Sequence, residues 1–217
     1  GGGTYQRCSN QNLSIKVNSG KQIGTAGGNP NQFGLDIWAS DSRISPLAMA
    51  NLSRWGFDNA HTVCPLDYFI PTEKEKLYSY VGRSSTDLRT IEPRCGTIEQ
   101  DILGTAQGTW FAFGTTQTYP EDPHLTLGLD NFNPILNVFS VGNSIAGLPS
   151  GTYSFTPQTT GKTNMAFSKV KPGTIYCYEP DGENFTILVE LTDVEKLKIE
   201  KKSNGTCSGA FSFANET

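Results

Sequence analysis

The chain of 217 residues has few charged side chains and no excess of positive charge. Asp, Glu, Lys and Arg make up 18% of the residues, against about 25% in an average soluble domain. The formal net charge is −4 at pH 7, so the chain has little with which to neutralise phosphates, and we expect no nucleic acid partner. The one basic run, residues 196–202, is interrupted by Glu200, and we interpret it as the solvated face of a strand.

Long apolar runs are also lacking. No stretch approaches the roughly 18 apolar residues that a membrane-spanning helix needs, so we expect no membrane span. No apolar signal-peptide region precedes the domain, and residues 1–12 are expected to be a flexible terminal segment. The abundance of Gly, Ser, Thr and Asn is typical of loop-rich extracellular β proteins, which predicts a secreted or cell-surface protein.

Catalytic signatures are scarce. Only two histidines occur, and phosphate-loop, dinucleotide-binding and Gly-x-Ser-x-Gly patterns are absent. The two imidazoles, together with nearby carboxylates, could hold a divalent metal, although no tight ligand spacing supports this. These candidate ligands are His61, His124, Asp67, Asp101 and Asp130. Calcium is a second option at two turns rich in oxygen ligands, residues 130–133 and 181–184, for which Asx turns are the simpler interpretation.

The five cysteines form no Cys-x-x-Cys pair, so disulfides are a better prediction than a zinc or redox site. Cys177 and Cys207 flank consecutive predicted strands, and we expect them to pair first. Cys64 with Cys95 is the second predicted pair, which leaves Cys8 unassigned. Closing the loop between Cys177 and Cys207 would contribute about 3–4 kcal/mol in the chain-entropy view.

Five Asn-x-Ser/Thr sequences are candidate glycosylation sites: Asn12, Asn51, Asn184, Asn204 and Asn215. A chain this rich in Asn, Ser and Thr carries several by chance. They predict exposed positions only if the source glycosylates its exported proteins.

Local patterns predict two short helices and a series of strands. Pro46 and Gly56 bracket a helix over 47–55, and Thr72 with Glu75 resembles a capping box that opens a helix over 72–81, with Leu77, Tyr80 and Val81 as its buried side. Alternating apolar residues predict an N-terminal strand, 13–17, and seven later strands: 110–113, 125–129, 138–141, 153–155, 174–178, 185–191 and 196–201.

This order of elements predicts a mainly β (α+β) fold, an antiparallel β-barrel or sandwich with two short helices in the N-terminal half. No Pro/Ser-rich linker interrupts the chain. We therefore expect a single domain over residues 1–217, with a helical insertion at 40–95 and a β core at 96–217.

Several segments resemble sequence segments of uncharacterised secreted bacterial proteins. They are 93–101, 104–111, 124–131 and 139–142, together 29 of the 217 residues. This resemblance implies export and carries no activity or catalytic residues to transfer. Gly108-Thr109-Trp110 is similar to the Gly-x-Trp signature of lipocalins, which would imply a ligand-holding barrel built after residue 100.

The leading functional hypothesis is an extracellular, non-enzymatic module that binds a glycan, a small ligand or a protein, or that packs into a surface assembly. Its candidate contact residues are aromatic: Trp38, Trp55, Trp110 and Tyr68. One alternative is a metal-dependent hydrolase that uses His61 and His124. Another is a glycosylated filament subunit, a homo-oligomer in which residues 13–17 add a strand to a neighbouring copy.

Overall fold

The computed structural model describes residues 14–18, 20–25, 37–117, 123–203 and 205–214. Residues 1–37 and 38–217 form two compact units, each described by itself. In the first unit, residues 14–17 form no strand, so the prediction of a strand over 13–17 is wrong for its described part. The apolar Ile15 and Val17 alternate with polar residues, as in a half-buried strand, but no described strand pairs with them. Alternation alone does not provide hydrogen-bond partners for the backbone N–H and C=O groups.

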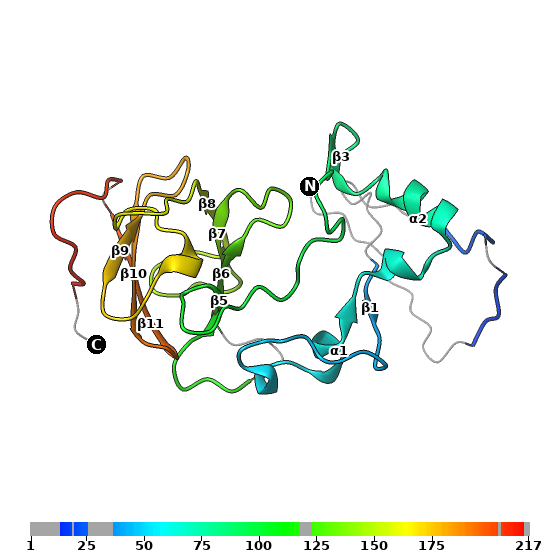
Figure 1. Cartoon of the computed structure of the whole chain (residues 1–217), viewed down its shortest axis with the longest axis horizontal. Helices are drawn as coiled ribbons and strands as arrows, with labels where there is room; N and C mark the ends of the chain where they lie inside the picture. Colours follow the sequence, from blue (N-terminus) through cyan, green and yellow to red (C-terminus); the bar gives the residue numbers. More distant parts are fainter. Residues whose placement is uncertain (1–13, 19, 26–36, 118–122, 204, 215–217) are drawn as a thin grey trace, which may run out of the picture. The chain divides into compact units, whose positions relative to one another are not determined.

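A four-stranded antiparallel sheet forms the centre of the second unit (Figure 1). Its strands follow the chain in the order β5-β6-β7-β8. They are β5 (Gly108–Phe111), β6 (His124–Leu129), β7 (Asn137–Val141) and β8 (Gly151–Phe155). Alternation sets the two faces: Leu125 and Leu127 of β6 are buried, while His124 before them and Thr126 between them point the other way.

A three-stranded antiparallel sheet lies beside it, in the order β11-β10-β9 (Figure 1). Its strands are β9 (Ile175–Tyr178), β10 (Thr186–Asp193) and β11 (Lys196–Lys202). β10 and β11, which are consecutive in the chain, form a hairpin. Its turn is held by Asp193, whose carboxylate accepts the Glu195 backbone N–H at 2.8 Å.

The two sheets share one hydrophobic core. At its centre are four fully buried rings whose centroids lie 4.9–5.9 Å apart, the aromatic cluster: Phe139, Phe155, Phe167 and Tyr178. They come from β7, β8, the 3-10 helix η3 (Phe167–Lys169) and β9, so the cluster joins both sheets. Edge-to-face contacts between such rings contribute about 0.5–1.5 kcal/mol each beyond the burial of apolar area.

The mainly β prediction is confirmed, and each of the seven strands predicted after residue 100 corresponds to a strand of these sheets. Boundaries differ most for β5, which begins at Gly108 instead of residue 110 and ends at Phe111. No strand pairing joins the two sheets, and the described residues form no closed barrel.

Residues 38–95 contain short elements only. Two small antiparallel pairs are β1 (Ala39–Ser40) with β2 (Thr62–Val63), and β3 (Gly82–Ser84) with β4 (Asp87–Leu88). The helical elements are η1 (Leu52–Arg54), α1 (Phe57–Ala60), η2 (Pro65–Tyr68) and α2 (Pro71–Tyr78). None of the described helices has the length and apolar content of a membrane span.

The predicted helix over 47–55 is wrong. Only the short η1 forms there, and α1 follows after Gly56. Hydrogen bonds to distant parts of the chain replace the local ones: the Leu47 backbone N–H donates to Ala60 O at 2.7 Å, and the Ala50 N–H donates to the Asp101 carboxylate at 2.8 Å. Pro46 and Gly56, which predicted the two ends of this helix, carry no information about hydrogen-bond partners elsewhere in the chain.

The second predicted helix exists as α2, with a different start and face. Pro71 is its first residue, and no side chain caps it, so the Thr72–Glu75 capping box does not form. Pro71 lacks an N–H that would need a partner, and this suits the position. Tyr80 lies beyond the helix and is 71% exposed, and no residue of α2 is fully buried.

Both predicted disulfides are present. Cys64 pairs with Cys95, and Cys177 pairs with Cys207. The second bond ties residues 206–212 to the sheet, where they border a hollow on the outer side of Leu188 in β10. Cys8 lies outside the described residues.

Candidate binding site

The two histidines have different surroundings. His61 is 8% exposed, its Nδ1 lies 3.1 Å from the backbone oxygen of Ile44, and its ring stacks on Phe57 at 4.4 Å. His124 begins β6 and points to the outer face of the four-stranded sheet, with its ring 6.0 Å from that of Phe111. These contacts make His61 a structural residue of the β1–β2 region.

The three aspartates predicted with them are engaged elsewhere. Asp67 accepts from Lys74 at 2.6 Å and from Tyr78 at 3.0 Å, and the hydrogen bond from Lys74 is the main reason that the pKa of Asp67 is lowered. Asp101 accepts the backbone N–H groups of Ala50 and Thr109. Within the described parts of the chain, no group of three or more His, Cys, Asp or Glu side chains is placed to hold a metal ion.

The two turns weighed as calcium loops are ordinary hydrogen-bonded turns. Asp130 Oδ1 accepts the N–H groups of Phe132 at 2.8 Å and Asn133 at 2.6 Å, which is an Asx turn. In the other turn, the Glu183 N–H donates to Pro180 O, and Gly182 takes a left-handed φ of 76°.

The predicted aromatic contact residues are dispersed. Trp110 packs against the core and donates from Nε1 to Ala106 O at 2.9 Å, and Trp55 contacts the edge of the Phe111 ring. Trp38 is 56% exposed and Tyr68 is 54% exposed, so these two remain available at the surface.

Of the five sequons, Asn51 and Asn184 lie in the described chain and are exposed. Asn12, Asn204 and Asn215 lie outside the described residues.

A row of hydroxyl side chains crosses the outer face of the four-stranded sheet. Strand register aligns one residue from each strand directly opposite the next: Thr109, Thr126, Ser140 and Thr152. We call this set the hydroxyl row. Neighbouring strands lie about 4.8 Å apart, so the hydroxyls form a regular line of donors and acceptors. The first two are hydrogen-bonded to each other at 3.0 Å, and the last two are exposed.

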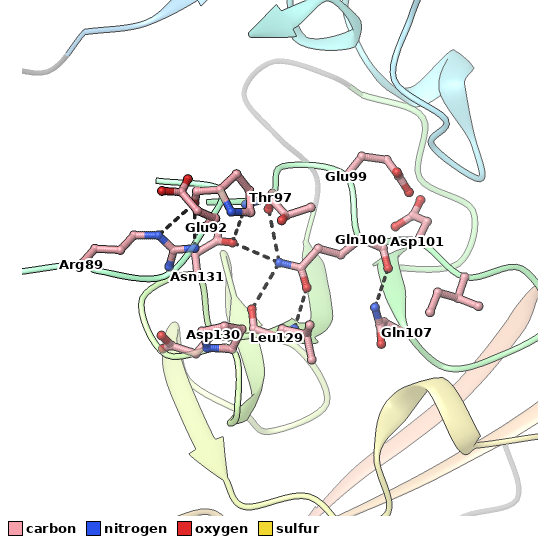
Figure 2. A pocket seen from close by; sticks show the side chains of 13 residues that line it. Arg89, Glu92, Thr97, Glu99, Gln100, Asp101, Gln107, Leu129, Asp130 and Asn131 are labelled. Atoms are coloured by element: carbon pink, nitrogen blue, oxygen red, sulfur yellow. Dashed lines mark hydrogen bonds between the residues drawn. The ribbon is translucent and has the colours of Figure 1, made fainter. Parts of the chain in front are cut away.

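Residues 97–101 run along the edge of this face and are held there by side chains that imitate strand pairing. The Gln100 amide bonds the backbone of Leu129 in both directions, with Nε2 donating at 3.2 Å and Oε1 accepting at 2.6 Å (Figure 2). Gly128 leaves room for this contact, since a Cβ there would lie 2.8 Å from Gln100 Oε1.

Two adjoining hollows flank residues 97–101. The sheet groove, about 310 Å³, has the hydroxyl row, Gly128 and Val138 on its floor. The Arg89 pocket, also about 310 Å³, is lined by Arg89, Glu92, Glu99, Gln107 and Pro134, among others. The two share six lining residues: Thr97, Gln100, Asp101, Leu129, Asp130 and Asn131. The two hollows therefore adjoin each other across residues 97–101.

A charged cluster lies near the start of the second unit. Asp41 is 9% exposed and accepts from Arg43 Nε at 2.8 Å, from Arg43 Nη2 at 2.7 Å and from the Tyr68 hydroxyl. The hydrogen bond from Arg43, followed by that from Tyr68, holds the pKa of Asp41 well below its usual range. All members of this cluster are matched to one another, which is the arrangement of a structural ion pair.

Of the residues that line the two hollows, the sequence analysis singled out only Asp101 and Asp130, and it assigned both to a metal site. The hydroxyl row depends on register between four strands. The only local signal was the recurrence of Gly-Thr and Ser at strand positions.

Comparison with known proteins adds no further constraint, because no protein-family model, curated protein or solved structure matches the chain.

Proposed function

We propose that this protein is a secreted, non-enzymatic module that binds glycans in the sheet groove. The hydroxyl row is the observation that carries the proposal. A sugar presents closely spaced hydroxyls that both donate and accept, and a line of Thr and Ser side chains on a rigid sheet offers matching partners. The two disulfides support export, since such bonds persist in oxidising compartments.

The border of the groove suits the same ligand. The side chains of Asp101, Asp130 and Asn131 supply further oxygen acceptors on one side. Phe111 and His124 do not line the groove, but they form an aromatic pair on the same face of the sheet, directly opposite each other on β5 and β6. Aromatic surfaces beside hydrogen-bonding groups favour the apolar faces of sugar rings.

The experiment is a binding survey of immobilised polysaccharides with the intact protein and the double variant Ser140→Ala/Thr152→Val. Both residues are exposed, so the variant removes two hydroxyls without opening the core. Losing two hydrogen bonds of about 0.5–1.5 kcal/mol each should weaken binding about tenfold. Thr192→Val, an exposed threonine of β10 outside the groove, is the matched control. Undiminished affinity of the double variant would remove the groove as the site.

Self-assembly by strand addition is a second candidate, supported by residues 14–17. This segment alternates apolar and polar residues, exposes Ile15 by 70% and Val17 by 54%, and pairs with no described strand. Ile15→Asp/Val17→Asp should then lower the sedimentation coefficient of the native material. If the unsubstituted protein sediments as a monomer at every concentration, the strand-addition hypothesis is wrong.

A further inference from the structure

Among the residues that the structure describes, Arg89 is a buried cation without a carboxylate partner. Only 6% of the residue is exposed. Its Nε and Nη2 donate to the backbone oxygen of Pro93 at 3.1 and 2.9 Å, while Nη1 is buried and has no hydrogen-bond partner in the described chain. Figure 2 shows the two bonded nitrogens and the third without a bond. A buried charge is costly unless an opposite charge or hydrogen bonds compensate for it.

Three of the four carboxylates that line the same pocket are committed to other groups. Glu92 pairs with Arg94 at 2.8 Å, and Asp101 accepts two backbone N–H groups. Asp130 accepts two more and lies 3.5 Å from Arg83. None of these three carboxylates bonds Arg89, so its charge is compensated only by the carbonyl oxygen of Pro93 among the groups described.

Glu99 also lines the pocket, and in Figure 2 it lies with Asp101 on the side of the drawing away from Arg89. Its charge disfavours an anion entering the pocket without cancelling the attraction of Arg89. A doubly charged phosphate would be repelled by Glu99 and Asp101 more strongly than a singly charged carboxylate. A ligand in the pocket is therefore best served by a single negative charge that lies next to Arg89 and away from Glu99 and Asp101.

We propose that the Arg89 pocket is a subsite for the carboxylate of an acidic saccharide, such as a uronic acid. The carboxylate would face Arg89, and the ring hydroxyls would face the amide side chains of Gln107 and Asn131. Because the pocket shares six lining residues with the sheet groove, one oligosaccharide can occupy both. This inference rests on the proposed glycan-binding function and specifies which glycans are preferred.

The test compares D-glucuronate, D-glucose and inorganic phosphate as probes of the full chain. Binding is followed by NMR at the arginine Nε–H signals and at the backbone amides of residues 126–131. We expect glucuronate to bind at least tenfold more tightly than glucose and more tightly than phosphate. Arg89→Gln should abolish the preference, and Glu99→Gln should increase the affinity for glucuronate severalfold while leaving that for glucose unchanged. Arg43→Gln, an exposed arginine outside the pocket, should change neither.

The outcomes separate the two proposals. Equal binding of glucuronate and glucose, a preference that survives Arg89→Gln in a folded variant, or tighter binding of phosphate overturns the acidic subsite alone. If no saccharide binds at either hollow, the proposed function fails as well. Should Arg89→Gln not fold, Glu99→Gln decides, because an unchanged ratio of the two affinities contradicts the subsite.

Discussion

Tyr178 carries a buried hydroxyl in the aromatic cluster, where no described group forms a hydrogen bond with it. The side chain is fully buried, and this burial raises the pKa of the hydroxyl well above its usual value. The ring is held by three neighbours at 5.0–5.3 Å, so packing and not hydrogen bonding keeps a tyrosine in place here.

Tyr178→Phe should therefore leave the free energy of unfolding unchanged or raise it by up to about 1–2 kcal/mol, because it removes an unpaired buried polar group. Tyr153→Phe is the matched control. Its hydroxyl donates to Pro149 O at 3.0 Å, and its loss should cost about 1 kcal/mol. Urea unfolding of the two variants checks this. A loss above 1 kcal/mol in Tyr178→Phe would show that a partner for the hydroxyl exists.

Asp41 is the residue from which we expect acid sensitivity. Its folded-state pKa is lowered, first by the hydrogen bond from Arg43, so its contribution to stability is present above the unfolded-state pKa of about 3.9. The contribution is lost as the pH falls below that value through the folded-state pKa. Asp41→Asn should thus lower stability at pH 6 and flatten the fall in melting temperature between about pH 4 and pH 2. Parallel curves for the two proteins would contradict this assignment.

At the scale of strands, Gly142 follows the last residue of β7 and lies beside His124, the first residue of β6. A Cβ at residue 142 would overlap the His124 ring, so the whole ring would have to move away from its place on the sheet. The Gly142 N–H also donates to His124 O, which holds the backbones together.

Gly142→Ala should reduce the free energy of unfolding by about 1–3 kcal/mol through overpacking. Replacing the ring, in Gly142→Ala/His124→Ala, should recover most of that loss relative to His124→Ala alone. Gly24→Ala is a control, since a Cβ there meets no atom within 4 Å. Thermal unfolding of the four proteins gives the coupling. Additive losses in the double variant would exclude the clash as the cause.

The sequence predicted the strands well because their pattern is local. In β10 and β11 the buried Ile187, Val189 and Leu191 alternate with residues of the other face, and the pairing partner follows within a few residues. The failed helix over 47–55 shows the limit of the same method. Its backbone groups bond Ala60 and Asp101, and the second of these partners lies 51 residues from Ala50.

The candidate site could not be predicted from local sequence patterns, for a related reason. Thr126 and Ser140 are unremarkable in their own strands, and only the register of four strands places them in one row. Arg89 gave no signal either, because the lack of a partner for its Nη1 is a property of packing. The predicted metal ligands do not lie together for the same reason. They were selected by residue type, and residue type does not show which other groups each side chain contacts in the fold.

At the scale of the molecule, the two disulfides close loops of almost equal length but support different parts. The sequence separations are 31 for Cys64–Cys95 and 30 for Cys177–Cys207. The chain-entropy contribution is therefore nearly the same, about 3–4 kcal/mol each. The difference lies in what each bond holds against the rest of the unit.

The Cys177–Cys207 bond fixes the C-terminal segment to the sheet of β9–β11. The Cys207 N–H donates to Glu179 at 2.6 Å, and the Ala214 N–H donates to Glu200 at 2.9 Å, so the segment is held at several points. By contrast, the Cys64–Cys95 bond closes a region of short elements with few buried residues. Such regions open locally at a lower free energy than a sheet with a fully buried core.

Cys177→Ala/Cys207→Ala should therefore increase amide hydrogen exchange in β9 and β10, together with a loss of about 3–4 kcal/mol in global stability. Cys64→Ala/Cys95→Ala should instead increase exchange over residues 62–95 while the amides of β6, β7 and β10 keep most of their protection. Hydrogen exchange measured by mass spectrometry on both variants distinguishes the two responses. If removal of the Cys64–Cys95 bond exposes the strands as much as removal of the other, residues 38–95 stabilise the β core directly, and the two regions unfold as one.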